Sequence, residues 1–376
     1  MPKDINKDRF PVETKLKLEI FAECFREWFP VFINNPYTKE VFIYDFFAGS
    51  GKDSDGTLGS PLILLNEAKG DNCKFCTQVK SNSKKIYFAF NEKEKAKQEL
   101  LIENIKEFMS NCLTQNCKAD KCVYNYTNFK QEEFKDIFQN NNFQSVLNNG
   151  NYGKFILLDQ YGFSQVDEDI FLKLINAPKT DFIFFISSSF IKRFNKHPYI
   201  KQYFDTNRIH FDEAQPKECH RLIAQYYRDI IPNNKEYYLH NFTIQKGTNY
   251  WGLIFGTNHT LGMEKFLKIC WNKDKLSGES NCNINNDFQA GTLFYNEKET
   301  IKKQTVDLDI QNKILTGEIL DNISGLKYAL KNGCLPELFT SVVKRLELEN
   351  KIVRVGELNY LSTNIHKVKQ YKINVI

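Results

Sequence analysis

Residues 41–51 read VFIYDFFAGSG, and this stretch decides the fold class. The apolar and aromatic run that ends at Tyr44 is typical of a strand covered on both faces, as in a parallel sheet between two layers of helices. Asp45 stands at the tip of this strand. A loop of small residues follows, in which a ligand can approach the backbone closely. Its residues are Ala48, Gly49, Ser50 and Gly51.

The acid at the strand tip indicates the kind of ligand. A carboxylate repels a diphosphate and attracts a cation or an amine, so Asp45 favours S-adenosylmethionine (SAM), with its sulfonium and α-amino groups, over NAD or ATP. The dinucleotide fingerprint G-x-G-x-x-G is absent, because no third glycine follows Gly51 at the required spacing, and a Walker lysine is absent too. We therefore expect Asp45 and residues 48–51 to bind SAM. The alternative is an ordinary tight turn in an α/β fold.

Further strands are predicted along the chain, and helical patterns separate several of them. Strands that alternate with helices favour an α/β fold with a mostly parallel, doubly wound sheet, in which ligands bind at the carboxyl ends of the strands. Four polar residues fall at such ends: Asp45, Glu92, Asn128 and Asp159. The predicted strands after the first are 86–90, 123–126, 154–159, 181–187 and 251–256, and the main predicted helices are 13–33, 61–68, 94–108, 134–138 and 216–230.

Glu92 and Asn128 are candidates for binding the rest of the cofactor. One carboxylate can accept two hydrogen bonds, so Glu92 after the second strand suits both ribose hydroxyls of SAM. Asn128 after the third strand can accept a hydrogen bond from the adenine amino group and donate one to a ring nitrogen. The alternatives are a helix N-terminal acid favoured by the helix dipole for Glu92 and a turn residue for Asn128.

Asp159 and Tyr161 follow the fourth strand, where a methyl-accepting amine would meet the methyl group of SAM. An Asp side chain can accept a hydrogen bond from such an amine, and an aromatic ring can stack on a base. Gln160 stands where enzymes that methylate exocyclic amines carry prolines. Methylation of a cytosine carbon would need a Pro-Cys nucleophile, and the chain contains no such pair. The alternative is that Asp159 is a structural acid at a strand tip.

Five cysteines have a spacing compatible with a structural zinc site. Two precede the second strand as C-x₂-C, and three precede the third strand as C-x₄-C-x₄-C, so both loops are expected at the amino end of the sheet. Any four of them could coordinate zinc far from the strand tips, and the alternative is a set of unrelated free thiols. The residues are Cys73, Cys76, Cys112, Cys117 and Cys122.

Composition limits the class of protein. The 376 residues are 41% hydrophobic, which is enough for one large domain and a smaller one. No apolar run approaches the ~20 residues of a membrane helix, and the charged residues 1–8 do not resemble a signal peptide. We therefore expect a cytoplasmic protein without membrane contact, whose ten cysteines are thiols or metal ligands rather than disulfides.

The pattern changes near residue 300, where a winged-helix-like domain is predicted. Three helices followed by a two-stranded hairpin are typical of that fold, and the third helix would carry the recognition residues. Residues 301–376 hold 12 Lys/Arg against 8 Asp/Glu, which is a weak indication of nucleic-acid binding; the alternative is a helical lid or a dimerisation unit. The predicted helices are 311–320, 323–331 and 335–350, the strands are 351–355 and 368–373, and the candidate nucleic-acid-binding residues are Lys344, Arg345 and Arg354.

Seven stretches share the pattern of one protein family. They are KLKLEI (15–20), YDFFAGSG (44–51), GSPL (59–62), FNEKE (90–94), LDQYGF (158–163), LIFGTN (253–258) and GMEK (262–265). Together they resemble the three-Cys-motif partner (TcmP) proteins over most of residues 13–275. The resemblance implies a SAM-methyltransferase-like Rossmann domain and a winged-helix-like tail. It also implies a phage-associated partner that resembles radical-SAM enzymes and carries three cysteines. The family usually has Asp-Pro-aromatic-Gly where this chain has DQYG.

The leading hypothesis is therefore a SAM-dependent methyltransferase that acts on nucleic acid in a phage, mobile-element or defence context. The alternative is a catalytically silent SAM-binding adaptor that brings a radical-SAM-like partner to nucleic acid, and a third hypothesis is a cofactor-free interaction protein. The predicted domains are an N-terminal helical segment (1–40), a Rossmann-like methyltransferase domain with cysteine-containing insertions (41–295) and a winged-helix-like module (300–376).

Overall fold

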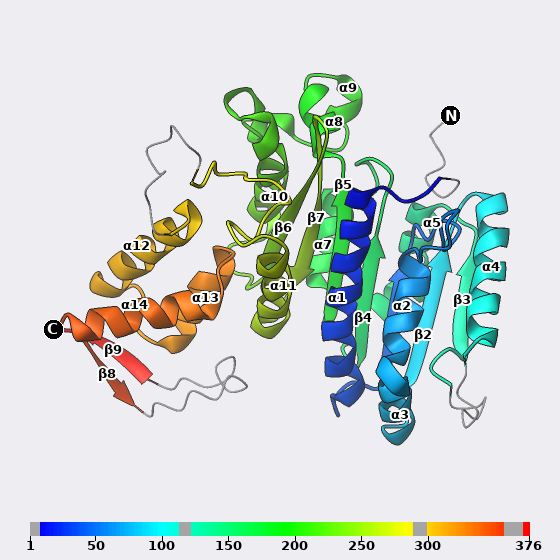
Figure 1. Ribbon diagram of the computed structural model, residues 1–376, viewed down its shortest axis with the longest axis horizontal. Helices are drawn as coiled ribbons and strands as arrows, with labels where there is room; N and C mark the ends of the chain where they lie inside the picture. The colour runs from blue at the N-terminus through cyan, green and yellow to red at the C-terminus, as the bar shows by residue number, and fades with distance from the viewer. Residues whose placement is uncertain (1–7, 113–121, 289–298, 357–370) are drawn as a thin grey trace.

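A seven-stranded sheet forms the centre of the molecule (Figure 1). The computed structural model describes residues 8–112, 122–288, 299–356 and 371–376. Strands β1 to β5 run parallel, and β7 is antiparallel to both β5 and β6. The strands, in the order β3-β2-β1-β4-β5-β7-β6 across the sheet, are β3 Tyr126–Lys130, β2 Lys85–Asn91, β1 Glu40–Asp45, β4 Tyr152–Leu158, β5 Thr180–Ile186, β7 Asn249–Thr257 and β6 Tyr238–Lys246.

The strand order confirms the predicted doubly wound α/β fold. The antiparallel β7 between β5 and β6 distinguishes this sheet from the 3-2-1-4-5-6 order of dinucleotide-binding domains and gives it the Rossmann-like order of SAM-dependent methyltransferases. Asp45 pairs in register with Phe90 of β2 and Leu157 of β4. The carboxyl tips of β1, β2 and β4 therefore end side by side, at the point where the strand order reverses and ligands bind in such sheets.

Helices cover both faces of the sheet, and each face has its own hydrophobic core. On β4, for example, Phe155 and Leu157 belong to the first core and Ile156 and Leu158 to the second, because successive side chains of a strand point to opposite faces. The first face carries α1 Val12–Asn34, α2 Ser60–Lys69, α3 Lys74–Ser81, α4 Lys95–Ser110 and α11 Thr260–Lys273. Residues of the second core come from α5 Phe134–Gln139, α6 Asn141–Leu147, α7 Glu168–Asn176, α8 Ser188–Arg193, α9 Pro198–Lys201 and α10 Cys219–Ile230.

Helix α1 crosses the middle of the first face and places its N-terminal turns at the carboxyl end of the sheet (Figure 1). Its aromatic side chains bury this face: Phe25 and Trp28 both pack against Phe155, with ring centroids 5.4 and 5.2 Å apart. The Trp28 Nε1 donates a hydrogen bond of 2.7 Å to the buried Asp181 carboxylate. The helix is therefore anchored at its centre, which fixes the position of the side chains on its first turns. In the described part of the chain, no helix combines the length and the hydrophobicity that a membrane span needs.

The C-terminal part packs beside β6 and α11 (Figure 1). Three helices are followed by an antiparallel pair of strands, and Asp321 forms a single β-bridge with Lys372. The prediction of a helix at 311–320 is wrong, because the first helix begins at residue 301 and ends at Leu315. Its buried side chains join the same core as α1 and α11, so the boundary predicted near residue 300 does not separate two cores. The elements are α12 Ile301–Leu315, α13 Asn322–Lys331, α14 Pro336–Leu348, β8 Ile352–Gly356 and β9 Tyr371–Val375.

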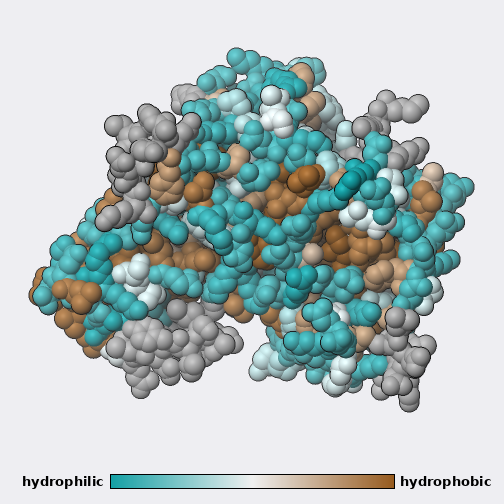
Figure 2. All heavy atoms as spheres, in the orientation of Figure 1, coloured by the Kyte–Doolittle hydropathy of each residue, from teal (hydrophilic) through white to brown (hydrophobic). Residues whose placement is uncertain are grey.

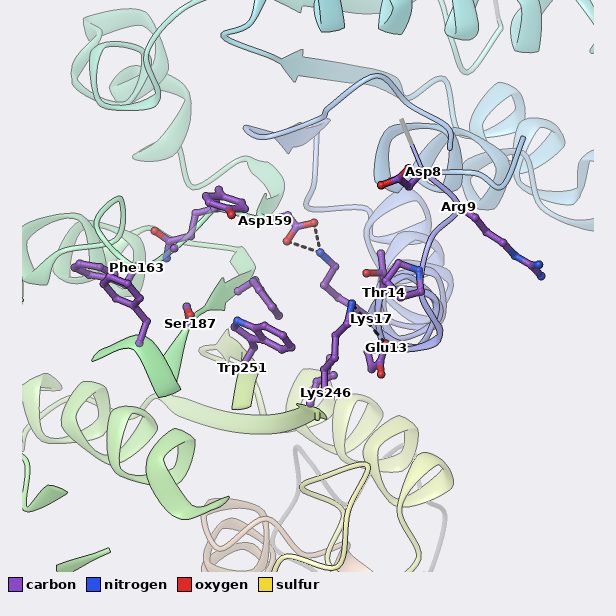
Figure 3. A pocket seen from close by; sticks show the side chains of 17 residues that line it. Asp8, Arg9, Glu13, Thr14, Lys17, Asp159, Phe163, Ser187, Lys246 and Trp251 are labelled. Atoms are coloured by element: carbon purple, nitrogen blue, oxygen red, sulfur yellow. Dashed lines mark hydrogen bonds and ion pairs between the residues drawn. The ribbon is translucent and has the colours of Figure 1, made fainter. Parts of the chain in front are cut away.

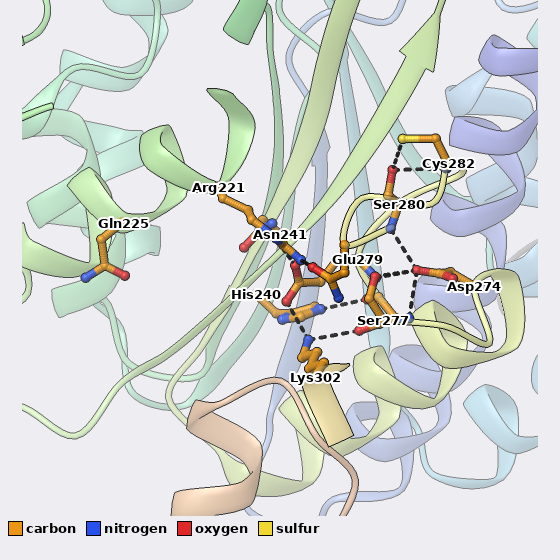
Figure 4. A network of polar contacts seen from close by, with 12 residues as sticks. Arg221, Gln225, His240, Asn241, Asp274, Ser277, Glu279, Ser280, Cys282 and Lys302 are labelled. Carbon is orange, nitrogen blue, oxygen red and sulfur yellow. Dashed lines mark hydrogen bonds and ion pairs between the residues drawn. The ribbon is translucent and has the colours of Figure 1, made fainter. Parts of the chain in front are cut away.

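A buried polar network attaches this C-terminal part to the sheet (Figure 4). The Glu279 carboxylate accepts hydrogen bonds from Arg221 of α10 and from Lys302 of α12. Burial alone would raise the pKa of Glu279, but the charges of Lys302 and Arg221 hold it well below its ordinary value. His240 of β6 donates from Nε2 to the Gly278 carbonyl at 2.9 Å, and burial lowers the pKa of His240 to about 3, so its ring is neutral. The Glu279 carboxylate thus joins α10 to α12, and the adjacent Gly278 carbonyl joins the same loop to β6.

Candidate functional site

Two adjoining cavities open at the carboxyl ends of the strands. The first, the β1–β2 pocket, has a volume of about 360 Å³ and lies at the tips of β1 and β2. The second, the β5–β7 pocket, has a volume of about 690 Å³ and lies above β5 and β7 (Figure 3). Four residues line both: Thr14, Lys17, Asp159 and Tyr161.

The small-residue loop after β1 forms one wall of the β1–β2 pocket. Gly49 and Gly51 have φ angles of 61° and 88°, a backbone region that residues with a side chain rarely adopt. The loop also packs tightly on the start of α2, because a Cβ added to Gly59 would lie 2.9 Å from the Gly51 carbonyl oxygen. Ala48, Gly49 and Gly51 line the pocket, whereas Ser50 is buried and its hydroxyl donates to the Lys52 carbonyl at 3.1 Å. Ser50 therefore shapes the loop and does not line the pocket.

Glu92 lies at the tip of β2 and lines the same pocket. One carboxylate oxygen accepts the Gly49 backbone N–H at 3.0 Å, and the other accepts the Glu94 backbone N–H at 2.8 Å. These bonds fix the orientation of the carboxylate against the glycine loop. Each oxygen can still accept a further hydrogen bond, and no Lys or Arg of the described residues forms an ion pair with Glu92. The half-buried group is therefore available to a ligand with two neighbouring hydroxyls.

Asp45 is fully buried at the tip of β1, beneath the glycine loop. Burial raises the pKa of Asp45 to about 7, hydrogen bonds from Ser60 and the Phe47 amide oppose the rise, and the charges of Asp159 and Glu92 add to it. The Phe47 N–H donates to Oδ1 at 3.2 Å, while Oδ2 has no hydrogen-bond donor among the described residues. A positive charge beside Asp45 would therefore stabilise its ionised form at the tips of β1, β2 and β4.

Asp159 lies directly after β4, between the two pockets, and forms an ion pair with Lys17 of α1 (Figure 3). The Lys17 Nζ donates to both carboxylate oxygens, at 2.7 and 2.5 Å, and the two side chains are only 13% and 18% exposed. The same ammonium lies 4.7 Å from the centroid of the Phe185 ring. An amine is therefore already held on Asp159, against an aromatic ring, where the sequence predicted that a methyl-accepting amine would bind.

Five aromatic side chains line the β5–β7 pocket. Figure 2 shows hydrophobic atoms exposed on this face, between the α8–α9 region and the N-terminal end of α1. Arg9, Glu13 and Lys246 place charges at its edge, and Tyr161 is 70% exposed. Gln160 is buried: its Oε1 accepts the Gln165 N–H at 2.8 Å, and its Nε2 has no acceptor among the described residues. The aromatic lining residues are Tyr161, Phe163, Phe185, Phe190 and Trp251.

Residues 8–10, just before α1, line the two pockets. The Phe10 N–H donates to the buried Asp53 carboxylate at 2.8 Å, and Arg9 approaches Asp55 at 3.4 Å. Phe10 lines the β1–β2 pocket and Arg9 lines the β5–β7 pocket. The loop that follows the glycines therefore holds Arg9 and Phe10 against the two cavities.

The prediction that Asn128 follows the third strand is wrong. The strand begins at Tyr126 and continues to Lys130, so Asn128 lies in its middle, exposed and paired with Ala89. The apolar residues that suggested an earlier strand, Val123 and Tyr124, are instead buried in the turn before β3. Because β3 is an edge strand with alternating exposure, it has no continuous apolar run that marks its limits. Glu132, Glu133 and Phe134, which follow its tip, line the pocket in place of Asn128.

The cysteines give no support for a zinc site. Cys73, Cys76, Cys112 and Cys122 lie around the buried Tyr124, and their charges add to the effect of burial in raising its pKa. Even so, no group of three or more His, Cys, Asp or Glu side chains among the described residues could hold a metal ion. Cys117, the fifth predicted ligand, lies outside the described residues.

Two of the three predicted nucleic-acid-binding residues are engaged within the C-terminal part. Arg345 forms a two-pronged pair with Asp307, at 3.1 and 2.5 Å. Arg354 pairs with Glu347 and is only 10% exposed. A guanidinium held by a carboxylate must give up that pair before it binds a phosphate. Of the three predicted residues, only Lys344 is exposed and without an ion pair to another described residue. The sequence could not reveal these pairs because the partners are separated along the chain or belong to different elements.

No protein-family model and no curated protein matches this chain. Among solved structures, it is similar to an O-methyltransferase from Bacillus cereus in complex with SAH (9% identity, 62% of this chain and 79% of the other, TM-score 0.31). It is also similar to a human methyltransferase 10 domain containing protein (7%, 64% and 82%, 0.30) and to M. capricolum TrmK with SAH (10%, 84% and 96%, 0.27). These TM-scores are too low to support an argument, so the fold assignment rests on the strand order.

Proposed function

We propose that this protein is a SAM-dependent methyltransferase that acts on an amino group of a nucleobase in a nucleic acid. The observation that carries the proposal is the cluster of Asp45, Glu92 and Asp159, three electrostatically coupled carboxylates at the tips of β1, β2 and β4. A cationic ligand with neighbouring hydroxyls matches both the charge and the hydrogen-bonding capacity of this cluster.

The residues of the β1–β2 pocket fit SAM. Glu92 would accept hydrogen bonds from the ribose hydroxyls, because its oxygens are already oriented by the Gly49 and Glu94 amides. Asp45, with one oxygen lacking a donor among the described residues, would favour the positive end of the methionine moiety. The open backbone at Gly49 and Gly51 lets the ligand approach the chain closely. When bound, SAM supplies an electrophilic methyl group on a sulfonium.

The β5–β7 pocket supports a flat, amine-bearing acceptor. Aromatic walls such as Phe163, Phe190 and Trp251 suit an unstacked base, as in enzymes that take a base out of a nucleic acid strand. Asp159 would accept a hydrogen bond from the exocyclic amine and hold its nitrogen toward the β1–β2 pocket. Lys17 must first leave Asp159 or share it. Catalysis would then consist mainly of positioning the two reactants.

A second function is favoured by the same ion pair. Because Lys17 occupies Asp159 and Gln160 replaces a proline, the chain could be a silent SAM-binding adaptor that brings a radical-SAM-like partner protein to nucleic acid.

In either case, we propose that α12–α14 with β8 and β9 form a winged-helix-like module, since three helices followed by an antiparallel pair match that order.

Isothermal titration with SAM and with its demethylated product tests the proposal. Wild type should bind both, and Glu92→Ala should weaken binding at least about 100-fold, which corresponds to two lost hydrogen bonds to a charged acceptor. Glu103→Ala, an exposed acid on the outer side of α4, is the matched control and should bind like wild type. Binding that is absent, or equal in Glu92→Ala and wild type, would contradict the proposed site.

Methyl transfer to DNA and RNA pools then separates the two functions. The methyltransferase proposal expects incorporation of labelled methyl groups that Asp159→Ala abolishes. SAM binding without any transfer, in the presence of single-stranded and double-stranded pools, would favour the adaptor.

A further inference from the structure

A short helical cap covers the carboxyl end of β5 beside the β5–β7 pocket. It contains α8 and α9 and lies at the same end of the sheet as the start of α1 (Figure 1). Residues 190–210, which form this cap, hold five Lys/Arg and one Asp, a net charge of +4. The whole chain has a net charge of only +5. This short segment beside the acceptor pocket therefore carries as much net positive charge as the whole of residues 301–376.

The cations of the cap are less neutralised than those of the C-terminal part. Lys196 and Lys201 are exposed and form no ion pair with the residues that the structure describes. Arg193 is exposed too, and its hydrogen bond goes to the neutral Asn249 side chain at 3.1 Å. By contrast, Arg345 and Arg354 are held by carboxylates. The cap is thus the better surface for a polyanion.

Aromatic rings run from the pocket to the outer surface of the cap. Phe163 and Phe190 line the pocket and stack with centroids 5.6 Å apart. Phe190 contacts Phe194 at 4.7 Å, and Phe163 contacts Tyr199 edge-on at 5.8 Å. Phe190, Phe194 and Tyr199 are 41%, 41% and 46% exposed, although large rings are usually covered. Exposed rings between free cations are the pattern of a surface that binds single-stranded nucleic acid.

We infer that the α8–α9 cap binds single-stranded nucleic acid and delivers an unpaired base into the β5–β7 pocket. This inference rests on the proposed function for the identity of the pocket. Arg193, Lys196 and Lys201 would contact phosphates, and Phe194 and Tyr199 would stack on bases. An unpaired strand is required because a paired base does not expose its face to a side-chain ring. The C-terminal part is then not the main nucleic-acid contact.

Fluorescence anisotropy with labelled oligo-dT and oligo-U, titrated over a range of salt concentrations, tests the inference. Lys196→Gln/Lys201→Gln should reduce the slope of log K against log salt by about 1.4, or about 0.7 for each lost phosphate contact. Phe194→Ala should weaken binding about tenfold through lost stacking. The charge-matched control is Lys344→Gln/Lys372→Gln, two exposed lysines of the C-terminal part, which should leave the slope unchanged.

Two results would overturn the inference. One is a reduced slope in the control pair with an unchanged slope in the cap pair, which would place the strand on the C-terminal part. The other is no binding of either oligonucleotide at low salt. Titration of the same proteins with SAM keeps the two proposals apart, because the cap variants should bind SAM like wild type even if the oligonucleotide result is negative.

Discussion

Replacement of Asp45 by Asn should remove the contribution of this carboxyl to the pH dependence of SAM binding. The Asp45 carboxyl is fully buried and has a pKa of about 7, raised mainly by burial and further by Asp159 and Glu92. A cationic ligand group close to Asp45 favours the ionised carboxylate and so lowers its pKa. Binding must then release a proton wherever the free protein carries one. An Asn side chain has a similar shape, keeps an acceptor for the Phe47 amide and cannot titrate.

The expected size follows from the pKa of about 7. At pH 6 such a group is about nine-tenths protonated, and a bound-state pKa of about 5 would release roughly 0.8 protons per SAM. A unit charge at about 4 Å contributes about 4 kcal/mol at an effective dielectric constant of 20, more than the roughly 2.7 kcal/mol that two pKa units require. SAM affinity should then rise about ninefold between pH 6 and pH 8.

Stability of the unliganded protein should change with pH in the opposite direction to SAM affinity. The folded-state pKa of Asp45 lies above its ordinary value of 3.8, so between about pH 4 and pH 7 the folded protein binds the extra proton. Ionisation of this group therefore destabilises the unliganded protein as pH rises through that window. Asp45→Asn should reduce the change with pH of both SAM affinity and the stability of the unliganded protein.

Calorimetric titration at pH 6, in buffers with different enthalpies of ionisation, measures the released protons directly. The titration of SAM itself is common to wild type and Asp45→Asn, so the difference between them isolates Asp45. Equal proton release and equal pH slopes in the two proteins would refute the reasoning. They would mean either that Asp45 is ionised before binding or that the positive end of SAM lies elsewhere.

Two further outcomes test the ion pairs Lys17–Asp159 and Lys302–Glu279. Urea unfolding of Lys17→Met, Asp159→Asn and the double variant should give a coupling energy of about 2 kcal/mol, since the ion pair is largely shielded from solvent; additive losses would show that the pair contributes no stability. Lys302→Met should lower the free energy of unfolding by about 2 kcal/mol, because Glu279 keeps Arg221 as its remaining cation. That variant should bind SAM normally by calorimetry, and a weakened affinity would mean that the C-terminal part influences the pocket.

The central strands could be predicted because burial on both faces leaves a continuous apolar run. That signal marks β1, β4 and β5. It fails at β6, which was not predicted, because His240, Asn241 and Thr243 are polar yet buried. The His240 ring bonds to the Gly278 carbonyl, and the Asn241 Oδ1 accepts from the Arg228 guanidinium, whereas the Asn241 Nδ2 and the Thr243 hydroxyl have no partner among the described residues. A strand that carries several polar residues resembles a loop in the sequence.

Local sequence patterns likewise predict some residues of the candidate site and miss those that reach it through tertiary contacts. The positions of Asp45 and Glu92 follow from local patterns, because the tips of neighbouring parallel strands end at one edge of the sheet. Lys17 and Trp251 reach the site from a helix near the start of the chain and from the antiparallel β7. Nothing local in the sequence indicates that Lys17 meets Asp159, 142 positions away.

The loop around Glu279 also determines how the outer edge of the sheet is protected. Strand β6 is the last strand, and its free side would offer unpaired backbone groups to another chain. Residues 279–281 cover part of that side: the Thr243 N–H donates to the Glu279 carbonyl at 2.6 Å, and the Asn281 N–H donates to the Thr243 carbonyl at 3.2 Å. Because Lys302 holds Glu279 in place, removal of the C-terminal part would loosen this cover. The shortened protein would then have an uncovered edge strand, and we expect it to self-associate through that strand.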